Sequence, residues 1–303
     1  MCGRVGGWRE GESGVPSRRT AGAALSIEIT DLTVQYGQSL AVRGLSLTVP
    51  TGSCFGLLGP NGAGKSSTIR CIATTQTPTS GTIRVGGHDV AAAPAEVRRL
   101  LGVVPQGLAL YDSLSVAENL RVFGGLFGLR GAALRGRVDW GLELSQLGAH
   151  RDKRVHTLSG GMKRRLNIAA SLLHAPKILV FDEPTTGVDP QSRNHIFDMI
   201  RALHKEGRTV VYTTHYMEEV EALCDRVAIV DHGRLVVCDT MEALLADAGS
   251  REFSVSLSEV TSVADLRARL AAAGVVVESL ESKGRSLEAV FLALTGRALR
   301  DAS

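Results

Sequence analysis

A glycine-rich segment near residue 60 contains the residue types that bind a triphosphate. It consists of Gly59, Pro60, Asn61, Gly62, Ala63, Gly64, Lys65, Ser66 and Ser67. An apolar run precedes it and a helix-like run follows it, which is the context that a phosphate-binding loop requires. Glycines let successive backbone N–H groups point at phosphate oxygens, and the helix N-terminus adds its positive end. Lys65 can bridge the β- and γ-phosphates, and the Ser66 hydroxyl can bind Mg²⁺. The alternative, a glycine turn without a ligand, does not account for strand, loop, Lys-Ser pair and helix all standing in register.

Two adjacent carboxylates follow a second apolar run, Ile178–Phe181. The carboxyl end of a buried strand faces the crevice in which ligands bind in open α/β sheets. We therefore expect Asp182 to hold Mg²⁺, in many cases through water, and Glu183 to orient and deprotonate the attacking water. An acidic pair that only ends a strand in solvent is the alternative, and the nearby phosphate loop argues against it.

A second helix start suited to anions lies at Ser159, Gly160 and Gly161. Its free N–H groups and capping hydroxyl are arranged to meet an anion, although helix capping alone would also explain Ser159. Two anion-binding helix starts beside one nucleotide cradle suggest that a site is shared between two copies. One apolar stripe is expected along the helix that follows, at Met162, Leu166, Ala169 and Leu173. The basic run Lys163-Arg164-Arg165 lies off this stripe, so we interpret it as a solvated face rather than a nucleic-acid site.

Short β-rich runs alternate with helical patterns along most of the chain, which is typical of an α/β fold with a mostly parallel sheet. The runs ILVF and VAIV are short and continuously apolar, so they are predicted as central strands buried on both faces. The predicted strands are Ile27–Val34, Leu45–Val49, Cys54–Leu58, Thr82–Val85, Gly102–Val104, Ile178–Phe181, Thr209–Thr213 and Val227–Val230. A helical insert is expected between about residues 107 and 157, with an apolar stripe at Val116, Leu120, Phe123 and Phe127.

The chain is expected to divide into three parts. Residues 1–24 are rich in Gly, Ser and Arg and are predicted as a disordered tail. Residues 25–240 form the nucleotide-binding domain, and residues 241–303 form a small α+β appendage. The appendage has weak strand patterns at Phe253–Leu257 and Val275–Glu278. Its last helix is predicted from an apolar stripe at Leu287, Val290, Phe291 and Leu294.

Composition excludes several classes of protein. The 303 residues include 34 Lys+Arg and 31 Asp+Glu, and the resulting net charge of +3 gives no basic face for nucleic acid. The five cysteines have no metal-ligand spacing, so reduced thiols are expected. No apolar run approaches the ~20 residues of a membrane helix, and the N-terminus is not expected to be a secretory signal, because no apolar region follows its arginines.

The phosphate loop and the acidic pair alone permit any P-loop NTPase, and five further motifs, seven in all in a fixed order, narrow the class of protein. The segment Leu158–Met162 resembles the LSGGQ signature of ABC ATPases, with Met162 in place of the usual Gln. Gln106 matches the Q-loop, Gly187–Pro190 the D-loop and His215 the switch histidine. Tyr36 resembles the aromatic residue that stacks on adenine. The resemblance covers about residues 27–240 and implies a P-loop NTPase fold with an antiparallel edge subdomain and a helical insert.

The same resemblance implies a head-to-tail dimer, in which the Ser159–Gly161 turn of one copy closes over the ATP bound by the other. Gln106 would sense the γ-phosphate and join Ser66 and Asp182 around Mg²⁺. His215 would bind the γ-phosphate, and Asp189 would link the two sites. Taken singly, Gln106 and His215 could be ordinary structural residues, and Tyr36 could be a packing aromatic.

Three segments, TTGVDPQSRNHIFDMI, YTTHYMEEVEALCDR and SLEAVFLALTGRALRD, resemble the daunorubicin/doxorubicin-resistance type of ABC-2 exporter ATPase and nodulation-factor exporters. This implies a motor for drug-like, lipid or polysaccharide export, held at the cytoplasmic face of the membrane by a separate integral-membrane permease. The apolar residues Leu108, Leu110, Tyr111 and Leu114 would meet that permease or simply pack under the insert. An importer ATPase and a soluble ABC ATPase acting on ribosomes or DNA are the alternatives. The second of these usually has paired domains or a long coiled-coil insertion, and this sequence has neither.

Overall fold

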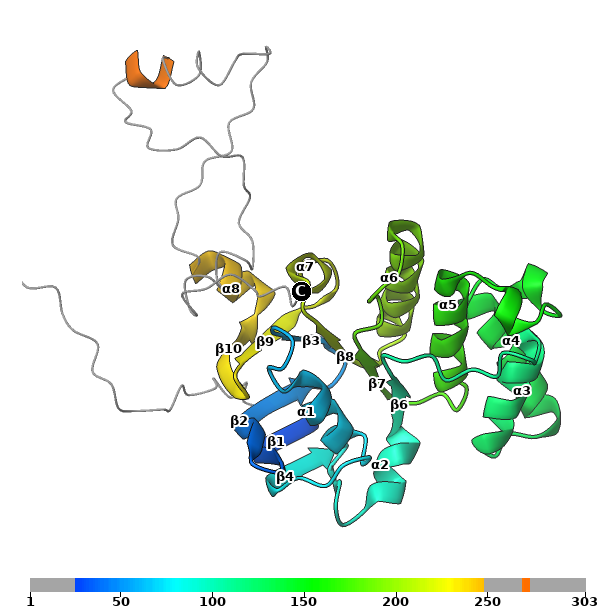
Figure 1. Ribbon diagram of the computed structural model, residues 1–303, viewed down its shortest axis with the longest axis horizontal. Helices are drawn as coiled ribbons and strands as arrows, with labels where there is room; N and C mark the ends of the chain where they lie inside the picture. Colours follow the sequence, from blue (N-terminus) through cyan, green and yellow to red (C-terminus); the bar gives the residue numbers. More distant parts are fainter. Residues whose placement is uncertain (1–24, 248–268, 273–303) are drawn as a thin grey trace, which may run out of the picture.

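Six strands form the central sheet of the computed structural model, which describes residues 25–247 and 269–272 (Figure 1). Their spatial order is β10-β9-β3-β8-β7-β6, and all neighbours are parallel except β10, which runs antiparallel to β9. The strands are β3 Cys54–Leu58, β6 Leu101–Val104, β7 Ile178–Asp182, β8 Thr209–Thr214, β9 Arg226–Asp231 and β10 Arg234–Thr240. The five predicted strands of this sheet are confirmed, whereas β10 was not predicted.

A second sheet of four antiparallel strands has the order β2-β1-β4-β5. The strands are β1 Leu25–Tyr36, β2 Ser39–Pro50, β4 Ser80–Val85 and β5 His88–Asp89. This sheet confirms the expected antiparallel edge subdomain, and its first two strands are longer than the sequence pattern predicted. Gly233, in the turn between β9 and β10, accepts a hydrogen bond from the backbone of Arg43 in β2, so the two sheets also meet along this edge.

The central strands are buried on both faces because their alternating side chains enter two different cores. Phe55 and Leu57 of β3 pack toward the antiparallel sheet, together with Ile69 and Ile72 of helix α1, Lys65–Ile72. The neighbouring strand residue Leu58 packs on the opposite face, against helices α6, Pro190–Lys205, and α7, Met217–Leu223. The continuous apolar runs are therefore strands buried on both faces, as their composition predicted.

The helices cover the central sheet and extend from one end of it (Figure 1). Their bounds are α2 Pro94–Leu100, α3 Val116–Leu126, α4 Gly131–Leu144, α5 Gly160–Ser171, α6 Pro190–Lys205, α7 Met217–Leu223 and α8 Met241–Asp247, with 3-10 turns at Gly148–His150 and Val155–Thr157. Helices α3, α4 and α5 share a core of their own, which includes Leu120, Leu142 and Leu166. The helical part of the molecule therefore includes α5, which also faces the central sheet.

Two stripe predictions need correction or adjustment. In α3, Val116 and Leu120 are fully buried, but Phe127 lies beyond the helix, is 42% exposed and stacks on the ring of His174. The stripe is therefore shorter than predicted, because the helix ends after Leu126 and the chain turns there. In α5 the predicted stripe packs into the helical core, although Leu173 lies past the helix end.

The first turns of the predicted appendage pack on the nucleotide-binding domain. Helix α8 follows β10 directly, and its Leu244 is buried in the core beneath the central sheet. The predictions for residues 1–24, for the strands Phe253–Leu257 and Val275–Glu278 and for the stripe at Leu287, Val290, Phe291 and Leu294 lie outside the described residues. Among residues 25–247 and 269–272, every helix is too short or too polar to span a bilayer.

Candidate functional site

The phosphate loop connects β3 to α1 and wraps closely around neighbouring backbone. Gly64 is the residue before α1 and has a left-handed φ of 99°. A Cβ there would lie 2.6 Å from the carbonyl oxygen of Ala41. Only glycine combines this φ with so close an approach, so the loop shape depends on residue type as the sequence pattern implies.

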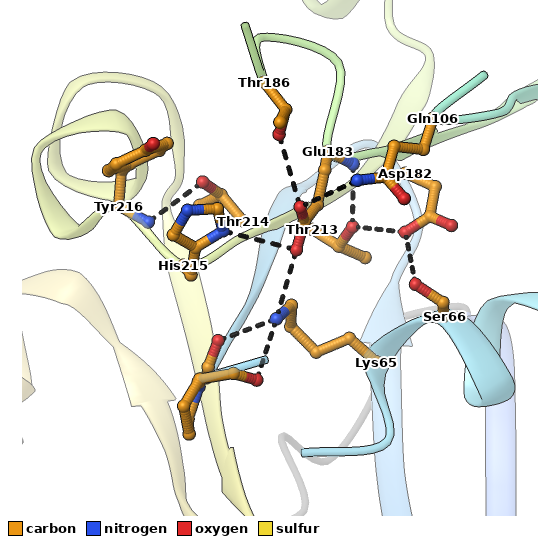
Figure 2. Close-up of polar contacts among 12 residues, drawn as sticks. Lys65, Ser66, Gln106, Asp182, Glu183, Thr186, Thr213, Thr214, His215 and Tyr216 are labelled. Carbon is orange, nitrogen blue, oxygen red and sulfur yellow. Dashed lines mark hydrogen bonds and ion pairs between the residues drawn. The ribbon is translucent and has the colours of Figure 1, made fainter. Parts of the chain in front are cut away.

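Lys65 begins α1 and folds its side chain back over the loop (Figure 2). Its Nζ donates to the carbonyl oxygens of Gly59 at 2.7 Å and Pro60 at 3.1 Å, and lies 3.2 Å from Glu183 Oε1. The side chain is only 4% exposed. Burial lowers the pKa of Lys65, and the charge of Glu183 opposes that shift. Nζ is therefore a buried cation that a phosphate oxygen can reach only by competing with Glu183.

Asp182 ends β7 and accepts two hydroxyl hydrogen bonds on one oxygen. Ser66 Oγ donates to Asp182 Oδ1 at 3.2 Å, and Thr213 Oγ1 donates to the same atom at 2.8 Å. Thr213 stands directly opposite Asp182 in the β7–β8 register. Hydroxyl and carboxylate oxygens are the donor set that Mg²⁺ prefers, so Ser66 and Asp182 fit the metal role predicted for them.

Glu183 follows β7 in a left-handed conformation, with φ of 45°. Such a backbone is unfavourable for a residue with a side chain and is concentrated at functional positions. The surrounding structure holds it in place, because the Glu183 N–H donates to the carbonyl oxygen of Thr213 at 3.2 Å and to its hydroxyl at 3.0 Å. The result is a carboxylate aimed across the phosphate loop.

The Glu183 carboxylate gathers the predicted catalytic residues around it (Figure 2). Oε1 lies 3.2 Å from Lys65 Nζ and 3.4 Å from His215 Nδ1. Oε2 accepts from Gln106 Nε2 at 3.4 Å and from Thr186 Oγ1 at 3.2 Å. Burial would raise the pKa of Glu183, but the charges of Lys65 and His215 outweigh it and hold the pKa below its ordinary value. Glu183 is thus a carboxylate at neutral pH and can accept a proton.

Gln106 contacts this carboxylate rather than the Ser66–Asp182 pair. Gln106 is exposed and lies near the start of the segment that follows β6. Among the described residues, no hydrogen bond joins the Gln106 side chain to either predicted metal ligand. The structure therefore brings Gln106 to the predicted base, and its place among the metal ligands stays a prediction.

The turn at Ser159 caps α5 on the outer surface of the molecule. Ser159 Oγ accepts from the Met162 N–H at 3.3 Å, and both Ser159 and Gly160 are exposed. A Cβ on Gly161 would collide with the side chain of Ser192 in α6. Asp189 caps α6, accepting from the Ser192 N–H at 2.9 Å. The signature turn and the D-loop are therefore neighbours.

Within one chain the signature turn is separate from the phosphate loop. Figure 1 shows the start of α5 apart from α1, across the strands of the central sheet. No hydrogen bond or ion pair among the described residues joins Ser159, Gly160 or Gly161 to the loop that ends at Lys65. In a single copy, the start of α1 and the start of α5 therefore cannot be part of the same anion-binding site.

Tyr36 ends β1 close to the start of α1. Its hydroxyl donates to Gln76 Oε1 at 2.5 Å and lies 3.3 Å from Ser67 Oγ. The residue remains 43% exposed. Hydrogen bonds, chiefly from Ser67, lower the pKa of its hydroxyl. The ring is thus held beside the phosphate loop with free surface, as an adenine-stacking residue requires.

The interpretation of Lys163-Arg164-Arg165 as a solvated face is wrong for Arg164. This side chain is 4% exposed and donates to four backbone carbonyl oxygens. The physical reason is that α5 is buried on two sides: Leu166 enters the helical core, and Ile168 enters the core under the central sheet. Arg164 precedes Ile168 by one turn and lies on this second face, which the single predicted stripe did not include.

A buried carboxylate that sequence analysis missed supports the His215 segment. Glu219 is 1% exposed and accepts hydrogen bonds from three hydroxyls. They belong to Thr185 at 2.7 Å, Tyr212 at 2.9 Å and Thr214 at 2.7 Å. These residues flank Glu183 on one strand end and His215 on the other. The only available signal was a glutamate four residues after the histidine, which is too common to be informative alone.

Comparison with known proteins is consistent with this geometry. The sequence pattern of the ABC transporter family matches residues 42–186. The linearmycin resistance ATP-binding protein LnrL of Bacillus subtilis is 39% identical, over 88% of this chain and 97% of that protein. The daunorubicin/doxorubicin resistance ATP-binding protein DrrA of Streptomyces peucetius is 44% identical, over 82% of this chain and 75% of that protein.

Two further proteins extend the comparison. The Nod factor export ATP-binding protein I of Ralstonia nicotianae is 38% identical, over 92% of this chain and 97% of that protein. A solved bacterial ABC transporter cassette, described as dimeric, aligns with a TM-score of 0.64 and 26% identity, over 71% of this chain and 98% of that one.

Proposed function

Because this chain belongs to the ABC transporter family of ATP-binding proteins, we propose that it is the ATP-hydrolysing motor subunit of an exporter and works with a separate membrane subunit. The observation that carries this proposal is the Glu183 carboxylate, which meets Lys65, Gln106 and His215 at the mouth of the phosphate loop. A general base, a buried cation and two polar sensors around one point suit in-line attack of water on a γ-phosphate.

Each residue of this cluster has a separate part in hydrolysis. Lys65 and the loop N–H groups bind the β- and γ-phosphates, so a triphosphate displaces Glu183 from the lysine. The freed carboxylate takes a proton from a water molecule, and the oxygen of that water attacks the γ-phosphorus. The bond between the γ-phosphorus and the β-phosphate oxygen breaks, which releases ADP and phosphate. Gln106 and His215 hold the water and the transferred phosphoryl group.

Ser66 and Asp182 are the residues that would hold Mg²⁺. Their oxygens already converge, since the Ser66 hydroxyl lies 3.2 Å from the Asp182 carboxylate. The metal supplies positive charge that balances the developing charge on the phosphate oxygens. Thr213 keeps the Asp182 carboxylate oriented from the neighbouring strand.

Two copies assemble head to tail in this proposal. The exposed turn at Ser159 and Gly160 of one copy would cover the triphosphate bound to the phosphate loop of the other copy. Each nucleotide site would then be formed by both copies. Asp189 lies next to the turn and links the two sites. The dimeric cassette among the solved relatives supports the pairing of two copies.

The membrane subunit would dock on the helical part of the chain. Of the four apolar candidates, Leu110 and Leu114 are partly buried, and Leu110 packs against the helical core. Leu108 and Tyr111 are 49% and 48% exposed and lie on the segment that follows Gln106. Packing under the helical insert therefore explains Leu110 and Leu114, whereas Leu108 and Tyr111 are suited to an interface with the permease. Docking there places the chain peripherally at the cytoplasmic side of the membrane, held by an ABC-2 type permease.

Substitution of this exposed pair tests the transport role. Genes next to this one are first read for a six-helix membrane protein, which is then coexpressed with the chain. Leu108→Glu/Tyr111→Glu is expected to reduce copurification at least about tenfold, since charged side chains at an apolar contact are poorly tolerated. ATP binding should be unchanged. Leu40→Glu is the matched control, because Leu40 is 40% exposed on the antiparallel sheet. Equal copurification of the double variant and wild type would remove this docking surface.

The transported molecule would touch the membrane subunit rather than this chain. The names of the relatives include drug resistance and Nod factor export, so we propose a drug-like, lipid or polysaccharide cargo. A neighbouring gene for a solute-binding protein would instead favour an importer.

A further inference from the structure

The guanidinium of Arg164 joins two segments that carry different parts of the hydrolytic site. Its Nη1 donates to the carbonyl oxygens of Pro105 at 2.8 Å and Gln106 at 2.9 Å. Its Nη2 donates to the backbone carbonyl oxygen of Glu183 at 3.1 Å, and its Nε donates to that of Pro184 at 2.5 Å. The first two residues follow β6 and the other two follow β7, so one planar group fixes the spacing between neighbouring strand ends.

The charge of Arg164 is solvated by backbone dipoles. All four acceptors are backbone carbonyls, and among the described residues no carboxylate forms an ion pair with it. Burial lowers the pKa of this guanidinium, but arginine remains a cation in proteins. The carbonyl dipoles therefore have to stay in place around the charge, which makes the two segments mutually rigid.

Arg164 also connects these segments to the signature turn. It stands at the start of the second turn of α5, whose first residues follow the Ser159 cap. Asn167, one turn further on, accepts from the Ala109 N–H at 2.9 Å, and in the described part of the chain its side chain holds only the segment after Gln106. Arg164 is thus the side chain of α5 that contacts the backbone of both Gln106 and Glu183.

We propose that Arg164 is a positioning residue for ATP hydrolysis, which sets Gln106 and Glu183 at their working separation and ties that separation to the signature helix. This inference rests on the proposed function, because it assumes that Glu183 activates water. Arg164 itself points at backbone and touches no reacting atom. If the signature turn moves when a second copy binds, the Arg164 guanidinium would transmit that movement to both Gln106 and Glu183. A lysine cannot replace it, because a single ammonium cannot donate to four carbonyls on two segments.

Steady-state kinetics with Arg164→Lys tests the proposal. We expect kcat for ATP to fall about 10- to 100-fold, because small misplacement of a base and its partner is costly. KM and the directly measured affinity for an ATP analogue should stay within about threefold, since the phosphate loop is untouched. Arg165→Lys is the matched control: Arg165 is the next residue, partly buried, and donates to the Ser145 carbonyl in α4. Its kcat should remain within about threefold of wild type.

A second set of measurements separates positioning from folding. Thermal unfolding and analogue binding are recorded for wild type, Arg164→Lys and Asn167→Ala, and Asn167→Ala should lower kcat less than Arg164→Lys. If Arg164→Lys loses ATP affinity or cooperative unfolding in proportion to kcat, Arg164 only holds the fold together and the proposal is wrong. Unchanged kcat would overturn it as well. If wild type and Arg165→Lys also fail to hydrolyse ATP, the proposed function fails instead.

Discussion

Lys65→Ala is expected to lower ATP turnover about 100- to 1,000-fold. The Nζ is the buried cation of the phosphate loop, held by the carbonyl oxygens of Gly59 and Pro60 and by Glu183. A charge aimed at the transferred phosphoryl group stabilises the transition state in a site that water reaches poorly, where single donors have effects of this size. In the chain without nucleotide, alanine also leaves Glu183 without its closest positive partner.

The measurement is ATP hydrolysis at saturating Mg-ATP, together with affinity for a fluorescent ATP analogue. Lys177→Ala is the control, because Lys177 is exposed at the start of the β7 segment, outside the loop. It should hydrolyse ATP at the wild-type rate. Turnover by Lys65→Ala within about threefold of wild type would mean that the loop does not hold the triphosphate.

Glu183→Gln is expected to bind ATP and to lose nearly all turnover, by about 100- to 10,000-fold. The amide keeps the shape of the side chain and its contacts with Gln106 and Thr186, but it cannot take the proton from water. It also removes one negative charge from the place that the γ-phosphate must approach, so ATP affinity should be equal or higher. ATP-bound dimers should then accumulate, because hydrolysis no longer separates the two copies.

Single-turnover hydrolysis and analytical ultracentrifugation with Mg-ATP measure these two effects. Glu218→Gln is a suitable control, since Glu218 is an exposed glutamate three residues after His215. Rapid hydrolysis by Glu183→Gln would exclude Glu183 as the base. The Asp182 pairing with Ser66 and Thr213 would then become the place to look for it.

Local patterns predicted the parts of this molecule that depend on neighbouring residues. The strand Cys54–Leu58, the glycine loop and the first residues of α1 form one continuous segment, so their order in the sequence carries their geometry. The same holds for Ile178–Phe181 followed by Asp182 and Glu183. Predictions of this kind placed the cradle and the carboxylates side by side, and the structure brings Lys65 to 3.2 Å from Glu183 and Ser66 to 3.2 Å from Asp182; their roles stay predictions.

Features that depend on distant packing were missed. Arg164 looks solvated in a sequence because three basic residues in a row are usually exposed, and only the two-sided burial of α5 reverses that. Phe127 matches a helical period, yet the chain leaves the helix one residue earlier. Glu219 has no local signal because its three hydroxyl partners come from two separate strand ends. Long-range contacts of this kind are not encoded in residue spacing.

Mixed dimers test the shared site most directly. Two proteins are prepared in the Glu183→Gln background, one with Lys65→Ala and one with Ser159→Arg. The first lacks a working cradle and keeps its signature turn, and the second has the reverse defect. In a head-to-tail pair of one of each, a single intact site remains, formed by the cradle of the second and the turn of the first.

Sedimentation with Mg-ATP is the measurement. Each double variant alone should sediment as a monomer, and the equimolar mixture should form ATP-dependent dimers. If Ser159→Arg/Glu183→Gln dimerises by itself, or if the mixture stays monomeric under conditions in which Glu183→Gln alone dimerises, the triphosphate is not held between one copy's loop and the other copy's turn.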